Sequence, residues 1–245
     1  MSFSLIIPTL NEYENLLILL PKIVNITDDV IIIDGPSNDG TRELCEKFNV
    51  RYMKQKSIGK GNALLEAVSC SKYDVVCFFD ADLAHDPGLI PKLVNPILNN
   101  DCLHVCGSRM LGGSSELFAD YDHFFRLFGS LIINYAISIK FKYKMTDCQN
   151  GFRAIHKSLL NQLTILSAHT TIEQELVGKT LALGVPVLEV PAHEYSRIHG
   201  ESKINIFKHG PAYIASLIKI LLMKRIPIDP GLHESLKKKY PHKWY

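Results

Sequence analysis

The feature that most constrains the fold is a regular alternation of short apolar runs with segments long enough to form helices. The apolar runs in the first half of the chain read FSLIIP, VIIID, VRYMK, VVCFFD and LHVCGS. The segments between them are predicted to be helices that begin near Glu14, Thr41, Gly61 and Pro87. Apolar strands that alternate with helices form parallel sheets whose two faces are both covered. The chain is therefore predicted to be an α/β protein with a Rossmann-like, mostly parallel central sheet.

The second half of the chain continues with less regular elements. The Gly- and Ser-rich segment from Leu111 to Tyr121 is predicted to be a mobile loop. Helices are expected at about 122–139 and 172–183, and a further strand, PVLEVP, precedes the loop YSRIHGESKIN. We expect one domain over residues 1–205 and a C-terminal appendage over residues 206–245.

The appendage is predicted to be an amphipathic helix, PAYIASLIKILLMKRIP, followed by a lysine-rich tail. The helix is too short to span a bilayer, and Lys219 lies in its middle. Such a helix lies on a membrane surface or docks on a partner, and a basic tail suits anionic lipid. The alternative interpretations are a plain core helix and a merely solvated tail.

Composition excludes some partners and compartments. The chain has 245 residues, 47% of them hydrophobic, which is enough for a full core, and its net charge of +2 gives no reason to expect nucleic acid as a partner. Its six cysteines form no CxxC pair, and Cys77, Cys102 and Cys106 lie within or beside apolar runs. We therefore expect reduced core cysteines. No basic leader precedes FSLIIP, which favours a cytoplasmic protein.

Polar residues gather where the predicted strands end, which is where parallel sheets bind their ligands. These residues are Asn11, Glu12, Asp34, Asp80, Asp82, Ser108 and Arg109. Asp80 and Asp82 directly follow a buried strand, so both carboxylates are expected near one point. Carboxylate oxygens suit Mg²⁺ or Mn²⁺, and such an ion neutralises a diphosphate leaving group. The alternative interpretation is that Asp82 or Asp86 caps a helix that begins at Pro87.

Two further turns carry candidate residues. In IIIDGPSNDGT, Asp34 ends a strand on the ligand side, where its carboxylate can accept a hydrogen bond from a nucleobase, whereas Asp39 is better interpreted as a helix cap. In IGKGNAL, Lys60 and Gly61 lie at a helix start, where a lysine and free N–H groups hold an anion or where the lysine is simply a surface residue.

Together these blocks make the sequence resemble family 2 glycosyltransferases, in particular the dolichyl-phosphate mannose synthase group of polyprenyl-phosphate glycosyltransferases. The resemblance runs from residue 5 to about residue 205. The blocks that carry it are IIPTLNEYENL, IIIDGPSNDGT, GKGNAL, FFDADLAHDP, GSRMLGG, DCQNGFRAIHKSLL, EQEL and EVPAHEYSRIHGESK. The last block is the most discriminating, because an arginine followed by G-x-S-K is typical of transferases that act on lipid phosphates.

The resemblance implies a GT-A fold and a set of site residues. The residues implied to bind the nucleotide sugar are Pro8, Asn11, Glu12, Asp34, Lys60 and Asp80. The implied ligands of Mg²⁺ or Mn²⁺ are Asp80 and Asp82. The residues implied to face phosphate groups are Arg109 and Arg126, and the loop that closes over donor and acceptor carries Arg197, Ser202 and Lys203. The implied catalytic residues are Asp82, Arg109, Arg197 and Lys203.

The sequence departs from the family pattern at two positions. Gly35 stands where many members have a second acidic residue, which leaves the nucleotide open, and Ala84 stands where many have a glutamine, which removes a metal ligand. Arg126 has loosely matching flanks, and a solvated arginine is its alternative interpretation. Glu175 in EQEL is expected to orient a substrate or to lie on a helix surface.

The function expected from this resemblance is inverting transfer of a hexose, first of all mannose from GDP-mannose, to a polyprenyl or dolichyl phosphate at the cytosolic face of a membrane. A lipid monophosphate is already mostly a dianion at neutral pH, so no strong general base is needed. The resemblance also allows for a membrane-embedded partner subunit.

Three other functions stay open or are disfavoured. A family 2 transferase with another donor, such as UDP-glucose, or with a hydroxyl acceptor would depend on Glu175 rather than on Arg197 or Lys203. A nucleotidyltransferase is disfavoured, because no Gly-rich segment with Arg and Lys follows the first strand. A non-catalytic nucleotide-sugar-binding subunit is disfavoured by the presence of both Asp80 and Asp82.

Overall fold

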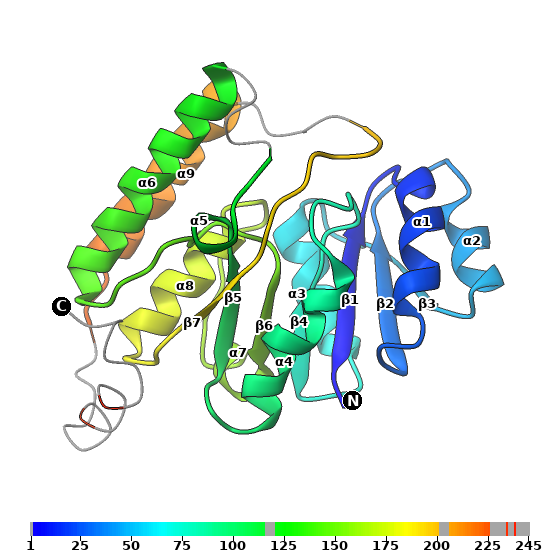
Figure 1. Cartoon of the computed structure of the whole chain (residues 1–245), viewed down its shortest axis with the longest axis horizontal. Helices are drawn as coiled ribbons and strands as arrows, with labels where there is room; N and C mark the ends of the chain where they lie inside the picture. The colour runs from blue at the N-terminus through cyan, green and yellow to red at the C-terminus, as the bar shows by residue number, and fades with distance from the viewer. Residues whose placement is uncertain (1, 116–120, 201–205, 226–233, 235–237, 239–245) are drawn as a thin grey trace.

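The computed structural model describes residues 2–115, 121–200 and 206–225, together with residues 234 and 238. Seven strands form one sheet in the order β3-β2-β1-β4-β6-β5-β7. The strands are β1 (Ser4–Thr9), β2 (Asp29–Asp34), β3 (Arg51–Lys54), β4 (Val75–Phe78), β5 (His104–Ser108), β6 (Arg153–His156) and β7 (Leu188–Pro191). Every pairing is parallel except the two that β6 makes with β4 and β5. The predicted mostly parallel α/β sheet is therefore confirmed (Figure 1).

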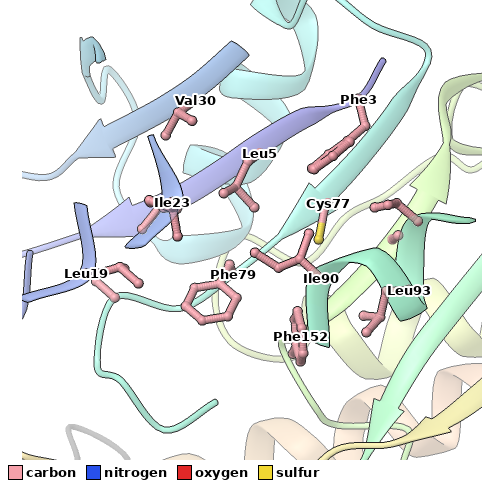
Figure 2. Packing of buried hydrophobic residues seen from close by; sticks show 14 of the residues in the cluster. Phe3, Leu5, Leu19, Ile23, Val30, Cys77, Phe79, Ile90, Leu93 and Phe152 are labelled. Carbon is pink, nitrogen blue, oxygen red and sulfur yellow. The ribbon is translucent and has the colours of Figure 1, made fainter. Parts of the chain in front are cut away.

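Helices cover both faces of this sheet, as predicted. They are α1 (Tyr13–Ile23), α2 (Thr41–Lys47), α3 (Lys60–Cys70), α4 (Ile90–Leu98) after the short 3-10 helix η1 (Pro87–Leu89), α5 (Arg109–Gly112), α6 (Tyr121–Phe141), α7 (Lys157–Leu160), α8 (Ile172–Ala182) and α9 (Ile206–Leu222). Successive β1 residues point to opposite faces: Leu5 and Ile7 pack with α1 and α4, whereas Ile6 packs with α3 and α8. Figure 2 shows the first of these two layers, with Phe3, Leu5 and Leu19 among its members.

The antiparallel strand β6 is the element that the sequence did not reveal. Its four residues, RAIH, are too few and too polar to show a strand pattern. Arg153 is nevertheless fully buried. Its guanidinium donates to the backbone carbonyls of Cys148, Asn150 and Glu173, so its hydrogen bonds are satisfied by main chain alone.

The last described helix, α9, begins at Ile206 and runs through Pro211, which the sequence had suggested as its start. One face of α9 packs through Tyr213, Leu217 and Ile220 on a third apolar cluster, which α6 and α8 supply. The opposite face exposes Ile214, Ile218 and Leu222. The helix is thus a packed element on one side and an apolar surface on the other, and no described helix is long and apolar enough to cross a membrane.

Two other expectations concern the cysteines and the loop at residues 111–121. All six cysteines are free thiols, and Cys77, Cys102 and Cys106 are buried, as predicted. Leu111 and Gly112 end the short helix α5, and residues 116–120 of the predicted mobile loop lie outside the described residues.

We expect Gly178→Ala to lower stability, because Gly178 on α8 packs directly against Ile220 of α9. An added Cβ would lie 2.7 Å from the side chain of Ile220, which is fully buried. Overpacking of this kind costs about 1–3 kcal/mol, which lowers Tm by several degrees in a chain of this size. Gly129→Ala on α6 is the matched control, because its Cβ meets nothing within 4 Å and alanine favours a helix. Thermal unfolding of both variants checks this, and equal Tm values would contradict the packing of α9.

Candidate functional site

A cavity of about 690 Å³ opens at the carboxyl ends of β1, β2 and β4, where the sequence predicted a ligand site. Its volume is in the range of small-molecule and cofactor sites. The sequence-predicted residues that line it are Pro8, Glu12, Lys60, Asp80, Asp82 and Arg197. The loop that joins β3 to α3, from Gln55 to Gly59, forms a further wall.

Asp80 and Asp82 lie together in the floor of this cavity, in the loop that directly follows β4. Asp82 is oriented by its own loop, since its carboxylate accepts the N–H of Ala84 at 3.1 Å. Leu83, which directly follows Asp82, adopts a φ of 61°, a left-handed conformation that is rare for a bulky residue and typical of functional sites. Asp86 caps η1 by accepting the N–H of Gly88, so the capping alternative holds for Asp86.

Both aspartates are paired with a cation. Lys60 approaches Asp80 at 2.7 Å, and Arg197 approaches Asp82 at 2.8 Å. Burial opposes ionisation of Asp80, but Lys60 outweighs it and holds the pKa of that carboxyl below its ordinary value. Asp82 behaves in the opposite way, because burial and the neighbouring charge of Asp80 raise its pKa despite Arg197. Each carboxylate thus has one cation beside it, and Asp82 is the one whose ionised form is disfavoured.

This charge distribution fits a divalent cation whose other ligands come from outside the protein. Two carboxylates close together supply hard oxygen ligands, which a divalent cation prefers. Among the described residues no group of three or more His, Cys, Asp or Glu side chains could hold a metal ion. Water and a ligand's phosphates would therefore have to complete the coordination, as Mg²⁺ commonly requires.

Lys60 also binds Glu173, a residue that the sequence did not single out. Their charged atoms are 2.8 Å apart, and Glu173 is almost fully buried, with its second oxygen lacking a hydrogen-bond partner. The two carboxylates raise the pKa of Lys60 although burial opposes its charge. The N–H groups of Gly61 and Asn62 donate to the carbonyl of Ala168, so they are not available to an anion.

Glu175, the acidic residue that the sequence did single out in EQEL, faces away from the cavity. Its carboxylate accepts the N–H groups of Leu166 and Ser167 and pairs with Lys179. It therefore fixes the loop before α8. The two glutamates are two positions apart on one helix, and only their surroundings in the fold distinguish them.

The segment before β6, which contains Gly151, packs against the charged groups in the cavity floor. A Cβ on Gly151 would lie 2.4 Å from the carboxylate of Asp80 and 2.9 Å from the ammonium of Lys60, so a side chain there would displace both groups. Asn150 and Arg153 hold this segment in place through the hydrogen bonds of its backbone. The block DCQNGFRAIHKSLL had marked the segment without assigning it a role.

Arg109 lies at the end of β5, where it makes a fork with Asp147. Its Nε is 2.7 Å and its Nη2 is 2.9 Å from the two carboxylate oxygens of Asp147, and its Nη1 is 3.3 Å from Glu194. These carboxylates hold the pKa of Arg109 above its ordinary value although burial opposes the charge. In this structure Arg109 therefore joins two loops rather than facing an open phosphate site.

Arg197 enters the cavity from the segment that follows β7. Tyr195 fixes this segment by donating its N–H to the carbonyl of Ala84 at 2.8 Å. Asn15 on α1 contacts the carbonyl of His199 at 3.3 Å, which ties the far side of the loop. Ser202 and Lys203 lie outside the described residues.

The remaining predicted residues have less direct positions. Asn11 has a φ of 54° and joins the end of β1 to the loop after β2, since its N–H donates to Ser37. Asp34 is buried beneath the cavity wall and accepts the hydroxyl groups of Thr9, Ser37 and Tyr52. Burial and Asp34 raise the pKa of Tyr52 to about 12.

Two expectations concern residues outside the cavity. Arg126 lies on α6, at the end of the molecule away from α1 (Figure 1), and does not line the cavity. Asp39 lies one residue before Gly40, the N-cap of α2, and accepts the N–H and hydroxyl groups of Thr41, the first residue of that helix.

Comparison with solved structures identifies the fold. Glucosyl-3-phosphoglycerate synthase from Mycobacterium tuberculosis, solved with Mn²⁺, UDP and phosphoglyceric acid, is similar with a TM-score of 0.71 and 21% sequence identity, over 94% of this chain and 80% of that one. The same enzyme solved with Mg²⁺ and UDP also gives a TM-score of 0.71. This likeness supports the expected GT-A-like fold.

Comparison with known sequences identifies the family. A dolichol-phosphate mannosyltransferase of Pyrococcus furiosus is 29% identical over 83% of this chain and 59% of its own length. A dolichyl-phosphate hexose transferase of Haloferax volcanii is 26% identical over 91% and 95%, and glycosyltransferase AglJ of the same organism is 30% identical over 79% and 63%. The chain thus spans less than two thirds of the mannosyltransferase and of AglJ. The family model "Glycosyl transferase family 2" matches residues 4–164, and the chain therefore belongs to this family of glycosyltransferases.

Proposed function

We propose that this chain transfers a hexose from a nucleotide sugar to a polyprenyl or dolichyl phosphate with inversion, and that mannose from GDP-mannose is the first donor to test. The observation that carries the proposal is the entry of Arg197 into the cavity, where it pairs with Asp82. An arginine in this position suits an acceptor that is itself an anion. The two relatives named for transfer to dolichol phosphate support the same acceptor class.

The acidic residues of the site also favour an acceptor that needs no general base. Glu173 is already paired with Lys60, and Glu175 is bound to backbone N–H groups outside the cavity. A hydroxyl acceptor would require a base beside it to take up its proton, whereas a phosphate dianion attacks without losing one. The work of the protein is then to position two anionic substrates beside each other.

The donor would lie over the aspartate loop. In this proposal Pro8 and Glu12 line the nucleotide site, and Asp80 and Asp82 hold Mg²⁺ or Mn²⁺. When bound, the metal ion neutralises the charge that develops on the departing diphosphate. Lys60 fixes the orientation of Asp80. Arg197 gives up its ion pair with Asp82 and contacts phosphate groups instead.

A membrane surface is the proposed location, because α6 and α9 lie side by side at one end of the molecule and expose apolar residues (Figure 1). These exposed residues are Phe128, Leu131, Ile132, Tyr135 and Ile139 on α6, and Ile214, Ile218 and Leu222 on α9. Their spacing of three and four places each set along one face of its helix. We call them the α6–α9 apolar face. Exposed Lys142 and Lys219 are placed to meet anionic headgroups.

The first test uses purified protein with Mg²⁺, a short polyprenyl phosphate and labelled GDP-mannose, UDP-glucose or UDP-N-acetylglucosamine in separate reactions. We expect label from one donor to enter the organic phase. Asp82→Asn is expected to lower this transfer by at least 100-fold, because the leaving group loses its charge partner. Asp28→Asn, an exposed residue away from the cavity, is the matched control. Transfer to phosphoglyceric acid or to a sugar hydroxyl instead would overturn the lipid acceptor but not the reaction type.

A second test uses Gly151→Ala, because the added methyl group would displace both Asp80 and Lys60. We expect transfer to fall by about 100-fold, since a displacement of roughly 1 Å in a reacting site has that effect. Titration with the nucleoside diphosphate and Mg²⁺ should show weaker binding, while circular dichroism stays unchanged. Full activity in this variant would remove Asp80 from the proposed site.

The third test concerns the α6–α9 apolar face. Replacing Ile214, Ile218 and Leu222 with serine should weaken binding to vesicles of phosphatidylcholine and phosphatidylglycerol roughly 100-fold, because about 1 kcal/mol of apolar burial is lost at each position. Leu166→Ser, an exposed apolar residue before α8, is the control. Unchanged co-sedimentation would exclude the bilayer as the occupant of this face. If the serine variant bound vesicles less well than the wild type only when a co-purified membrane protein was present, a partner subunit would be favoured as the occupant of this face.

A further inference from the structure

His85 is a buried histidine beside the aspartate loop that the proposed reaction does not use. It lies three residues after Asp82 and is 7% exposed. Its Nδ1 is 2.9 Å from the backbone carbonyl oxygen of His193, and its Nε2 is 3.0 Å from Oδ1 of Asn150. Its ring stacks on Phe152, with centroids 5.2 Å apart and an interplanar angle of 28°. The ring thus touches two segments that are far apart in sequence.

The orientation of the Asn150 amide decides what His85 must donate. The N–H of Phe152 donates to Oδ1 of Asn150 at 3.0 Å, whereas Nδ2 of Asn150 is buried without a partner. Exchanging the two amide atoms would place Nδ2 against the N–H of Phe152, which sets donor against donor. Oδ1 therefore faces His85, and it is an acceptor, as is the carbonyl of His193.

Two acceptors require two donors. A neutral imidazole carries one N–H and one lone pair, so it would leave one of these contacts as lone pair against lone pair at 2.9 or 3.0 Å. An imidazolium satisfies both, and hydrogen bonds from a charged donor are the stronger kind.

The surroundings of His85 favour a positive charge. The face of the Phe152 ring, on which the His85 ring stacks, attracts a cation. The other charged groups nearby are turned elsewhere. Arg153 donates to main-chain carbonyls, Asp86 accepts from Gly88, and the His193 ring contacts Gly112 and Ser115.

We propose that His85 is a positioning residue that, as an imidazolium, clamps the aspartate loop between Asn150 and the segment that delivers Arg197. On one side it holds His193, two residues before Tyr195, whose N–H binds Ala84. On the other side it holds Asn150, next to Gly151, which contacts Asp80. The expected effect of His85 on the use of the polyprenyl phosphate acceptor rests on the proposed function, whereas the protonation state of His85 does not.

The protonation state is tested without any substrate. Nitrogen NMR of the wild-type chain at neutral pH, with the His85 signals assigned by their loss in His85→Gln, should show a proton on both ring nitrogens. Asn150→Asp should keep or raise Tm. The Nδ2 group that it removes has no hydrogen-bond partner, and the new carboxylate lies against the imidazolium. The same substitution in the His85→Gln background should lower Tm, so the two changes are not additive.

The positioning role is tested by kinetics of His85→Gln. We expect kcat/KM for the polyprenyl phosphate to fall 10- to 100-fold, while the affinity for the nucleoside diphosphate with Mg²⁺, measured by calorimetry, changes less than about threefold. His104→Gln is the control, because His104 is buried between Thr180 and Cys106, away from the aspartate loop.

Either of two results would overturn the inference. One is a ring nitrogen of His85 without a proton, and the other is an equal loss of nucleotide and acceptor binding in His85→Gln, which would indicate a merely structural role. If the wild type transfers no sugar to lipid phosphate, the proposed function fails, but the NMR and melting experiments still decide the state of His85.

Discussion

The ammonium group of Lys60, held between Asp80 and Glu173, is the interaction on which the site depends. It joins the start of α3, the end of β4 and the first turn of α8, which are three elements from distant parts of the chain. Burying two carboxylates is costly unless a cation accompanies them. Gly151 allows the three groups to meet, because any side chain there would separate Asp80 from Lys60. The geometry of the cavity floor therefore follows from one cluster of charges, in which the Glu173 side chain is 4% exposed and those of Lys60 and Asp80 are 23% and 34% exposed.

The same balance of charges extends around the site. Arg197 pairs with Asp82, and Arg109 pairs with Asp147 and Glu194, so each arginine already has a carboxylate partner. In the proposed function, entry of a diphosphate is an exchange of partners for Arg197 rather than the filling of a bare positive site. Arg109, with three of its nitrogens engaged and little exposure, is much less free to exchange. Its role is to keep the loop of Asp147 beside the segment that carries Arg197.

The sequence predicted what depends on local pattern and could not predict what depends on distant contacts. Apolar runs revealed the parallel strands, and the rule for their carboxyl ends pointed to Asp80 and Asp82, whereas Lys60 was singled out as a residue at a helix start. Strand β6 escaped because its four residues include a buried arginine, whose partners are main-chain carbonyls that no pattern encodes. Glu173 escaped for the same reason, since only the folded position of Lys60 distinguishes it from Glu175.

Helix α8 connects the site to the α6–α9 apolar face. Its first turn carries Glu173, which binds Lys60, and its next residue, Gln174, donates to the backbone carbonyl of Tyr213 on α9. Further along, Gly178 admits Ile220 of α9 at close range. One short helix thus fixes the distance between the cavity and the proposed membrane face. If the acceptor phosphate is presented from a bilayer, this packing sets the height of the cavity above the lipid. The phosphate then meets the cavity at a fixed distance, which favours a reactive orientation.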